Sequence, residues 1–377
     1  MLRNLFMLHN VIMLFEIDAC HFDNTGEIIM KLNVRLTGLW VFMVLSLFSC
    51  TATVQTDEER FGWWEAARQY VETDYGRIAV VQRGKGPVAV YLHGFPLNAW
   101  HWRHQLDELA DIRRGIAIDL MGLGHTEIAA DQDLRFSTQA DMVLATLDAM
   151  GVREFDLIGN DSGGGIAQLI VAKAPKRVRS LVISNADVHD NWPPQALSTV
   201  HDLAINGQMD DVLQAYMHDV ESARNGLAAL VYEDPQYLTE ALLASYTEPL
   251  LRTATSREAV NRYIASQDNS ETVAIKPQLE AYDRPTLIMW GTDDVFFDVE
   301  WAYWLQSTIP GTYAVVEMPG ARLFLSEERA EDVNILLRAH FEHLDVDRSG
   351  LGPEIISGQA MPDLRARQRP NDWMSRW

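Results

Sequence analysis

Two side chains that can attack an electrophile stand side by side in the stretch L-I-G-N-D-S-G-G-G-I-A at 157–167, namely Asp161 and Ser162. A sharp strand-to-helix turn that lifts a nucleophile above a sheet needs small residues two positions before and two positions after it. Both positions hold glycine around Asp161, whereas the first holds the bulkier Asn160 around Ser162. The spacing therefore favours Asp161 as the nucleophile.

The string D-S-G-G within this stretch also suggests a serine protease of the chymotrypsin type, but its context argues against that class. Those enzymes are all-β double barrels whose His and Asp partners lie upstream in particular loops. Here the string joins an apolar strand pattern at 155–158 to a helical pattern. Ester hydrolysis with Ser162 as the nucleophile is kept as a weaker alternative.

Apolar runs bounded by turn residues alternate with helical patterns from Tyr75 onward, which predicts a mostly parallel sheet covered by helices on both faces. The turn G-K-G-P at 84–87 joins the first two strands. We predict strands at 78–82, 88–92, 115–120, 155–158, 181–185, 286–290 and 314–318, and helices at 102–111, 139–150 and 165–174.

The stretch 187–282 breaks this rhythm, because it contains helical patterns and no convincing strand. We expect helices at 195–206, 210–223, 235–245 and 256–266. They are predicted to form a cap over the carboxyl edge of the sheet, where ligands bind in open α/β sheets. Most of the tyrosines among and between these helices are expected to pack the interior of the cap: Tyr216, Tyr232, Tyr237, Tyr246 and Tyr263.

The composition is that of a large, acidic, globular chain. It has 377 residues, of which 47% are apolar, and a formal net charge of −22 from 31 Lys and Arg against 53 Asp and Glu. Such a charge repels phosphate backbones, so nucleic acid is not an expected partner. The only cysteines, Cys20 and Cys50, precede the globular region, so its fold has neither a disulfide framework nor a cysteine metal site. No metal and no cofactor are predicted.

The N-terminal region has the pattern of an export signal. A basic segment from Met30 to Arg35 precedes an apolar run at 36–48, which is too short to span a bilayer comfortably. The run ends in L-F-S-C, which resembles a lipoprotein cleavage box with Cys50 as the lipidated residue. We therefore predict an exported protein, periplasmic or anchored to a membrane through Cys50. A plain signal peptide, a short membrane anchor and a cytoplasmic location are the alternatives, and Met30 is the expected true start.

The predicted organisation has five parts. They are an N-terminal extension with the signal segment (1–50), the first part of an α/β core (51–186), the helical cap (187–282), the second part of the core (283–345) and a tail rich in Pro, Gly and charge (346–377).

Three motifs in this order resemble the α/β-hydrolase superfamily over about residues 75–345. They are H-G-F-P at 93–96, the glycine turn at 119–126 and G-x-D-x-G-G at 159–164. An Asp at the elbow is similar to the branch that contains haloalkane dehalogenases, fluoroacetate dehalogenases and epoxide hydrolases. The resemblance implies an α/β-hydrolase fold, with a mostly parallel central sheet, flanking helices and the cap inserted before the last two strands.

The resemblance also implies a chemistry. The carboxylate of Asp161 attacks an sp³ carbon and forms an alkyl–enzyme ester, which a His-activated water then hydrolyses. The oxyanion hole consists of the backbone N–H groups of Phe95 and Ser162. The acid that orients the His is placed at Asp294, three residues after a glycine, with Asp187 as the alternative.

The base position departs from the family pattern. In the stretch P-G-A-R-L-F at 319–324, Leu323 occupies the place where His belongs, and leucine cannot accept a proton. His125 and His189 lie nearer the expected pocket and are the alternatives for a substitute base. His340 and His343 are expected to face solvent on the final helix.

The leucine at position 323 and the serine at position 162, which both depart from the family pattern, limit the predicted activity. Dehalogenases of this branch commonly hold the halide with a Trp after the nucleophile, where this chain has Ser162, although Trp192 and His93 are predicted to contact substrate. We therefore predict an α/β-hydrolase that attacks a small apolar electrophile of the epoxide, halide or ester type through Asp161, with slow turnover because the base is missing. The alternative is a catalytically degenerate member that binds a small molecule or a protein.

Overall fold

The computed structural model describes residues 3–8, 11–22, 28–34, 57–191 and 193–348. The chain divides into two compact units, Met1–Trp63 and Trp64–Trp377. In the first, β1 (Arg3–Leu8), β2 (Val11–Phe22) and β3 (Ile28–Val34) form an antiparallel sheet, for which the sequence analysis predicted no element.

The predicted apolar run at 36–48 and Cys50 lie outside the described residues, so export and lipidation stay predictions, whereas most of the basic segment before that run belongs to β3. None of the described helices is long and apolar enough to cross a membrane.

An eight-stranded sheet forms the centre of the second unit, in the order β11-β10-β9-β8-β6-β7-β5-β4. Neighbouring strands from β7 to β11 are parallel, whereas β5 pairs antiparallel with both β7 and β4. This confirms the predicted mostly parallel sheet. The strands are β4 (Gln69–Thr73), β5 (Gly76–Gly84), β6 (Val88–Leu92), β7 (Arg114–Ile118), β8 (Phe155–Asp161), β9 (Val178–Ala186), β10 (Thr286–Gly291) and β11 (Thr312–Met318).

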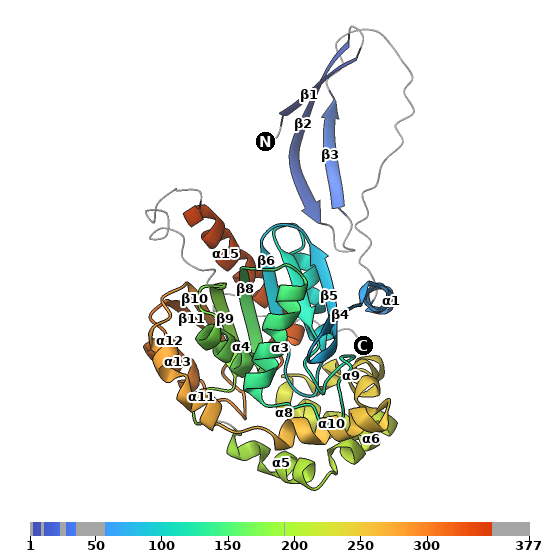
Figure 1. The fold of residues 1–377 in the computed structure, drawn as a ribbon. Coiled ribbons are helices and arrows are strands. Elements are labelled where there is room, and N and C mark those ends of the chain that lie inside the picture. Colours follow the sequence, from blue (N-terminus) through green and yellow to red (C-terminus); the bar gives the residue numbers. More distant parts are fainter. Residues whose placement is uncertain (1–2, 9–10, 23–27, 35–56, 192, 349–377) are drawn as a thin grey trace. The chain divides into compact units, whose positions relative to one another are not determined.

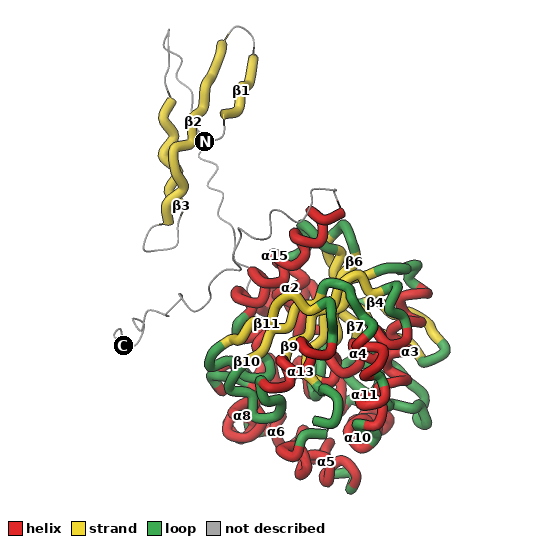
Figure 2. The backbone as a smooth tube through the Cα atoms, turned by 90° about the vertical axis from the view of Figure 1, so that its left-hand side faces the viewer, coloured by secondary structure: helices red, strands yellow, loops and turns green. Residues whose placement is uncertain are grey.

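Helices cover both faces of this sheet, as its buried central strands require. Helices α2 and α15 lie on one face, and α3, α4 and α13 lie on the other (Figure 2). Helix α1 (Asp57–Ala67) precedes β4 in the chain. The core helices are η1 (Ala99–Trp102), α2 (Arg103–Glu108), α3 (Phe136–Ala149), α4 (Ser162–Lys173), α13 (Glu300–Thr308), α14 (Leu325–Glu328) and α15 (Ala330–Arg348).

Between β9 and β10 the described residues form helices only, in agreement with the helical interval expected from the sequence. In Figure 1 most of the helices of this interval gather at one end of the sheet, below the strands in that view, whereas its last helix, α12, lies beside the sheet. They are η2 (Gln195–Leu197), α5 (Ser198–Ile205), α6 (Met209–His218), α7 (Val220–Ala223), η3 (Arg224–Ala228), α8 (Ala229–Val231), η4 (Pro235–Tyr237), α9 (Glu240–Leu251), α10 (Ala254–Ala265), α11 (Ser270–Ala274) and α12 (Lys276–Glu280).

The structure refines three local predictions. The turn at 84–87 joins β5 and β6 as predicted, and β7 lies between these strands in the sheet. Strand β4 was missed because its sequence, Q-Y-V-E-T, is polar and lies at the sheet edge. Helix α4 begins at Ser162, immediately after the elbow, and includes the glycines that were predicted to precede it.

The prediction for His340 was wrong, because this residue is fully buried and does not face solvent. Its Nδ1 lies 2.8 Å from the hydroxyl of Tyr313 and its Nε2 lies 3.0 Å from the Oγ of Ser180. Burial lowers the pKa of His340 to about 3, so the ring is neutral near pH 7. It therefore packs helix α15 against the sheet and is not available as a base.

Candidate active site

Asp161 lies at the apex of the turn between β8 and α4, with φ 55° and ψ −132°. A Cβ atom at Gly159 would lie 2.5 Å from the carbonyl oxygen of Gly163, and one at Gly163 would lie 2.3 Å from that of Leu92. Both distances are too short for a side chain, so the turn requires glycine at these positions. The geometry therefore places Asp161, and not Ser162, at the apex.

Two backbone N–H groups bind the carboxylate of Asp161. The N–H of Phe95 donates to Oδ2 over 2.9 Å, and the N–H of Ser162 also donates to this carboxylate. The approach is close because residue 94 is glycine: a Cβ there would lie 2.1 Å from Oδ2 of Asp161. The structure thus brings together the two residues that were predicted to form the oxyanion hole.

Burial sets the electrostatics of Asp161, which is 5% exposed. Desolvation raises its pKa to about 7, the N–H groups of Phe95 and Ser162 oppose this rise, and the negative charge of Asp294 adds to it. The carboxyl is thus poised to change its charge near neutral pH, as functional carboxyl groups often do.

Asp294 follows β10 and is held by its surroundings. Its Oδ2 accepts from the Nδ2 of Asn185 over 2.6 Å, and its Oδ1 accepts from the N–H of Phe296 over 2.8 Å. Asn185 also accepts from the N–H of Gly291 over 2.7 Å, so it links the ends of β9 and β10. Burial raises the pKa of Asp294 to about 6, although these donors oppose the rise. Asp294 was predicted from the sequence, whereas Asn185, which donates to its carboxylate, was not.

Asp187 lies just after β9 and is fully buried. Its main-chain N–H points to the carbonyl oxygen of Asp161 over 3.4 Å. In the described part of the chain neither of its carboxyl oxygens has a hydrogen-bond partner. Burial raises its pKa well above the usual value, and the charges of Asp161 and Asp294 raise it further. The site therefore contains three interacting carboxyl groups.

Among the residues that the structure describes, no imidazole forms a hydrogen bond with the carboxylate of Asp161. All hydrogen bonds of Asp161 in the described residues come from the main chain. The Nδ1 of His125 lies 3.5 Å from Asp119, and His189 bonds Asp190 over 3.0 Å and packs against Trp304. Neither alternative raised from the sequence contacts Asp161.

Leu323 stands where the family pattern led us to expect a histidine, and it is 4% exposed. Its carbonyl oxygen accepts from the Nδ2 of Asn160, the residue before Asp161, over 3.0 Å. The loop that carries Leu323 is therefore tied to the elbow.

Of the two residues predicted to contact substrate, the structure describes only His93. His93 is buried, its Nδ1 bonds the carbonyl oxygen of Gly94 over 2.9 Å, and its Nε2 accepts from the N–H of Leu120 over 3.1 Å. Because both ring nitrogens are engaged by the main chain, His93 holds the loop instead of contacting a substrate. Trp192 lies outside the described residues.

Tyr263 is the cap tyrosine that reaches the elbow. Its hydroxyl lies 2.8 Å from the Oγ of Ser162, and its ring stacks on Phe95 with centroids 6.3 Å apart. The side chain is fully buried and its pKa is well above the usual value, chiefly because of desolvation, so it is a neutral phenol near pH 7. This contact brings the cap helix α10 over Asp161.

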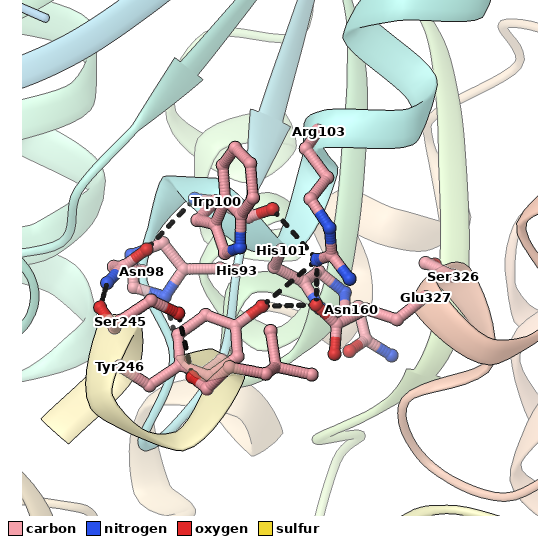
Figure 3. A network of polar contacts seen from close by, with 12 residues as sticks. His93, Asn98, Trp100, His101, Arg103, Asn160, Ser245, Tyr246, Ser326 and Glu327 are labelled. Carbon is pink, nitrogen blue, oxygen red and sulfur yellow. Dashed lines mark hydrogen bonds and ion pairs between the residues drawn. The ribbon is translucent and has the colours of Figure 1, made fainter. Parts of the chain in front are cut away.

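A second buried cluster joins the cap to the core (Figure 3). Arg103 on α2 forms an ion pair with Glu327 on α14, which also accepts from the hydroxyl of Tyr246 on α9. Glu327 accepts from the hydroxyl of Tyr232 over 2.5 Å, and Arg103 donates to that of Tyr237 over 3.1 Å. Three cap tyrosines are therefore bound to one buried ion pair of the core.

Arg103→Met is expected to destabilise the protein by about 3 kcal/mol, because it leaves Glu327 as an uncompensated buried charge. Urea denaturation measures this loss. The double variant Arg103→Met/Glu327→Leu is expected to regain most of it, since both charges are then gone. Arg338→Met is the control, because Arg338 pairs with Asp111 at the surface and such pairs contribute about 0–1 kcal/mol. Equal losses in Arg103→Met and Arg338→Met would contradict the prediction.

The sheet, the elbow, the two N–H donors and the cap define an α/β hydrolase. The chain belongs to the alpha/beta hydrolase fold family, whose model matches residues 87–328. It is 26% identical over 282 residues to "Epoxide hydrolase 4" of Mus musculus, covering 70% of this chain and 74% of that protein. It is 24% identical over 289 residues to "Haloalkane dehalogenase 2" of Mycobacterium tuberculosis (strain ATCC 25618 / H37Rv), covering 72% and 91%.

Solved structures support the same fold. The structure titled "Epoxide hydrolase CorEH without ligand" superposes with a TM-score of 0.62 at 22% identity, covering 74% of this chain and 99% of that one. The predicted fold class is therefore confirmed, and the chain is assigned as a hydrolase of this fold by its relatives.

Proposed function

We propose that the protein attacks a small apolar electrophile through Asp161 and forms an alkyl–enzyme ester that hydrolyses slowly. The observation that carries this proposal is the position of Asp161 at the apex of a glycine-lined turn, with Oδ2 bound by the N–H of Phe95 at 2.9 Å. A carboxylate held at one oxygen presents the other, Oδ1, for attack on an sp³ carbon.

The same donors serve the second step. When water adds to the ester carbonyl, the negative charge develops on the carboxyl oxygen of Asp161 that the N–H groups of Phe95 and Ser162 bind. The oxyanion is thereby stabilised. What this step lacks is the imidazole base of the family pattern, because Leu323 cannot take a proton from the water. The ester is therefore expected to form faster than it is hydrolysed.

An epoxide suits the site better than a halide. Opening an epoxide places negative charge on its oxygen, and the phenol of Tyr263, which lies beside the elbow through its contact with Ser162, is a hydrogen-bond donor for that oxygen. The residue after the nucleophile is Ser162 and not the Trp that commonly holds a halide in the dehalogenases this chain resembles. The cap tyrosine and this serine together support the epoxide.

Intact-mass spectrometry after incubation with styrene oxide and with 1-bromohexane tests the proposal. We expect a covalent adduct of one substrate per chain, mapped to Asp161 by peptide analysis and lost in Asp161→Ala. Asp293→Asn is the matched control, because this exposed neighbour of Asp294 makes no contact with Asp161. Absence of an adduct with every electrophile, or labelling of Ser162 by a fluorophosphonate, would contradict the proposal.

The second candidate is a binding protein without turnover, which the leucine at position 323 favours. In that case a ligand binds without forming an adduct. Restoring a histidine at position 323 then produces no turnover either.

A further inference from the structure

Asp187 is the polar group of the site that the proposed reaction leaves unused. It is fully buried, and in the described residues neither carboxyl oxygen is hydrogen-bonded. Leaving a buried polar group unpaired costs about 1–3 kcal/mol. Such a cost is typical of a residue kept for its chemistry.

The local structure does not depend on this carboxyl group. The main chain of Asp187 is satisfied, since its carbonyl oxygen accepts from the Nε2 of Gln168 over 2.7 Å and its N–H points to the carbonyl oxygen of Asp161. The side chain itself holds nothing in place. A substitution of Asp187 by an uncharged residue of similar size is therefore compatible with folding.

The groups that act electrostatically on Asp187 are acids and a phenol. They are Asp161, Asp294 and Tyr263, and none of them carries a positive charge. Neighbouring buried carboxyl groups cannot all be ionised, so one proton is shared and resides on the group with the highest affinity. Because Asp294 is bound by Asn185 and Asp161 by two N–H groups, Asp187 is the group that keeps the proton.

We propose that Asp187 is the proton carrier of this site, which gives a proton to the epoxide oxygen and later takes one from the hydrolytic water. The inference rests on the proposed function of Asp161. It assigns to Asp187 the role of the missing imidazole and makes epoxides the substrate class.

In the first step, the Oδ1 of Asp161 forms a bond to an epoxide carbon, and the bond between that carbon and the ring oxygen breaks. The ring oxygen keeps the electron pair of the broken bond and takes the proton of Asp187. The products are a neutral ester on Asp161, a hydroxyl group on the substrate and a carboxylate at Asp187. Since Asp161 no longer carries a charge, Asp187 is stable as an anion.

The second step restores both groups. A water molecule gives one proton to Asp187, and its oxygen adds to the ester carbonyl carbon of Asp161. The tetrahedral intermediate collapses as the bond between the carboxyl carbon and the ester oxygen, the former Oδ1, breaks. That oxygen leaves with the substrate and takes the remaining proton of the water, whose oxygen stays in the carboxylate of Asp161. A diol leaves, Asp161 is again a carboxylate, and Asp187 is again protonated.

A halide does not complete this cycle. It leaves as an anion and takes no proton, so Asp187 stays protonated after the ester has formed and cannot act as a base. The haloalkane adduct is therefore expected to accumulate, whereas the epoxide adduct is hydrolysed.

Time-resolved intact-mass spectrometry of the full chain under single-turnover conditions tests the inference, with Asp187→Asn and the control Asp293→Asn. With styrene oxide, Asp187→Asn is expected to slow formation and hydrolysis of the adduct at least about 100-fold each. With 1-bromohexane, adduct formation is expected to be unchanged, which a variant with a merely distorted site does not show. The melting temperature of Asp187→Asn is expected to be equal to or above that of the unmodified chain.

The outcomes separate the two proposals. An epoxide adduct that is hydrolysed equally fast in Asp187→Asn and in the unmodified chain overturns the role of Asp187 and leaves that of Asp161 intact. Absence of any adduct in the unmodified chain overturns the proposed function, and the inference with it. If Asp187→Asn does not fold, Asp187→Leu and Asp187→Ser replace it, with the same comparison between epoxide and haloalkane.

Discussion

Leu323→His is expected to accelerate hydrolysis of the Asp161 ester about 10²–10⁴-fold, the usual contribution of a positioned general base. Leu323 lies in the loop between β11 and α14. Its carbonyl oxygen accepts a hydrogen bond from Asn160, which precedes Asp161 in the chain. The family resemblance makes Asp294 the expected acid partner of an imidazole there, and Asn185 already orients that carboxyl. We therefore expect the surroundings of position 323 to accept an imidazole base.

The measurement is the decay of a preformed adduct, made from 1-bromohexane so that the missing base limits the reaction. Leu323→Gln is the matched control, because it places a polar side chain of similar reach at position 323 without a titrating group. The rate of adduct formation is expected to be the same in the unmodified chain, in Leu323→His and in Leu323→Gln, because the side chain at position 323 acts only on the hydrolysis of the ester. Equal rates of adduct decay in Leu323→His and Leu323→Gln would show that a base at position 323 does not reach the ester.

Leu323→His also tests the role of Asp187 in the second step. Once an imidazole takes the proton from water, Asp187 is no longer needed for the second step with any substrate. Adding Asp187→Asn to Leu323→His is therefore expected to leave the decay of the adduct fast, while epoxide opening stays slow. The two substitutions together separate the proton donor of the first step from the base of the second.

The fold and the elbow were predictable because their signals are local. Strand and helix periods identified the alternating core, and the glycines on both sides of Asp161 identified the apex, which the close approach of Gly163 to Leu92 explains. The order of the strands in the sheet is not local. The turn at 84–87 therefore could not reveal that β7 lies between β5 and β6.

The parts that were missed depend on residues far apart in the chain. Arg103 and Glu327 are 224 positions apart, and no spacing rule connects them. His340 belongs to a polar helix, and only its packing shows that it is buried between Tyr313 and Ser180. Asp187 was recognised as an acid near the site, but its lack of a partner is a property of the folded structure alone.

The rate of adduct formation is expected to rise about 100-fold between pH 5 and pH 8 when the substrate is 1-bromohexane. Attack requires ionised Asp161, and burial, reinforced by the charge of Asp294, raises the pKa of Asp161 to about 7. Below that value the ionised fraction falls about tenfold for each pH unit, so the rate falls with it. A profile with its midpoint near pH 4 would show that the carboxyl is not desolvated in solution.

With styrene oxide the profile is expected to have a second, descending limb at higher pH. The epoxide oxygen needs the proton of Asp187, whose pKa is raised above its usual value by burial and by Asp161 and Asp294, so the rate falls once that proton is lost. Tyr263 also faces the site, but its raised pKa keeps it a neutral phenol throughout this range. Asp187→Asn is expected to remove the descending limb, and its persistence would assign the proton to Tyr263. Because the haloalkane needs no proton, its rate stays constant above pH 8. The difference between the pH profiles of styrene oxide and 1-bromohexane therefore measures the contribution of Asp187 as the proton donor.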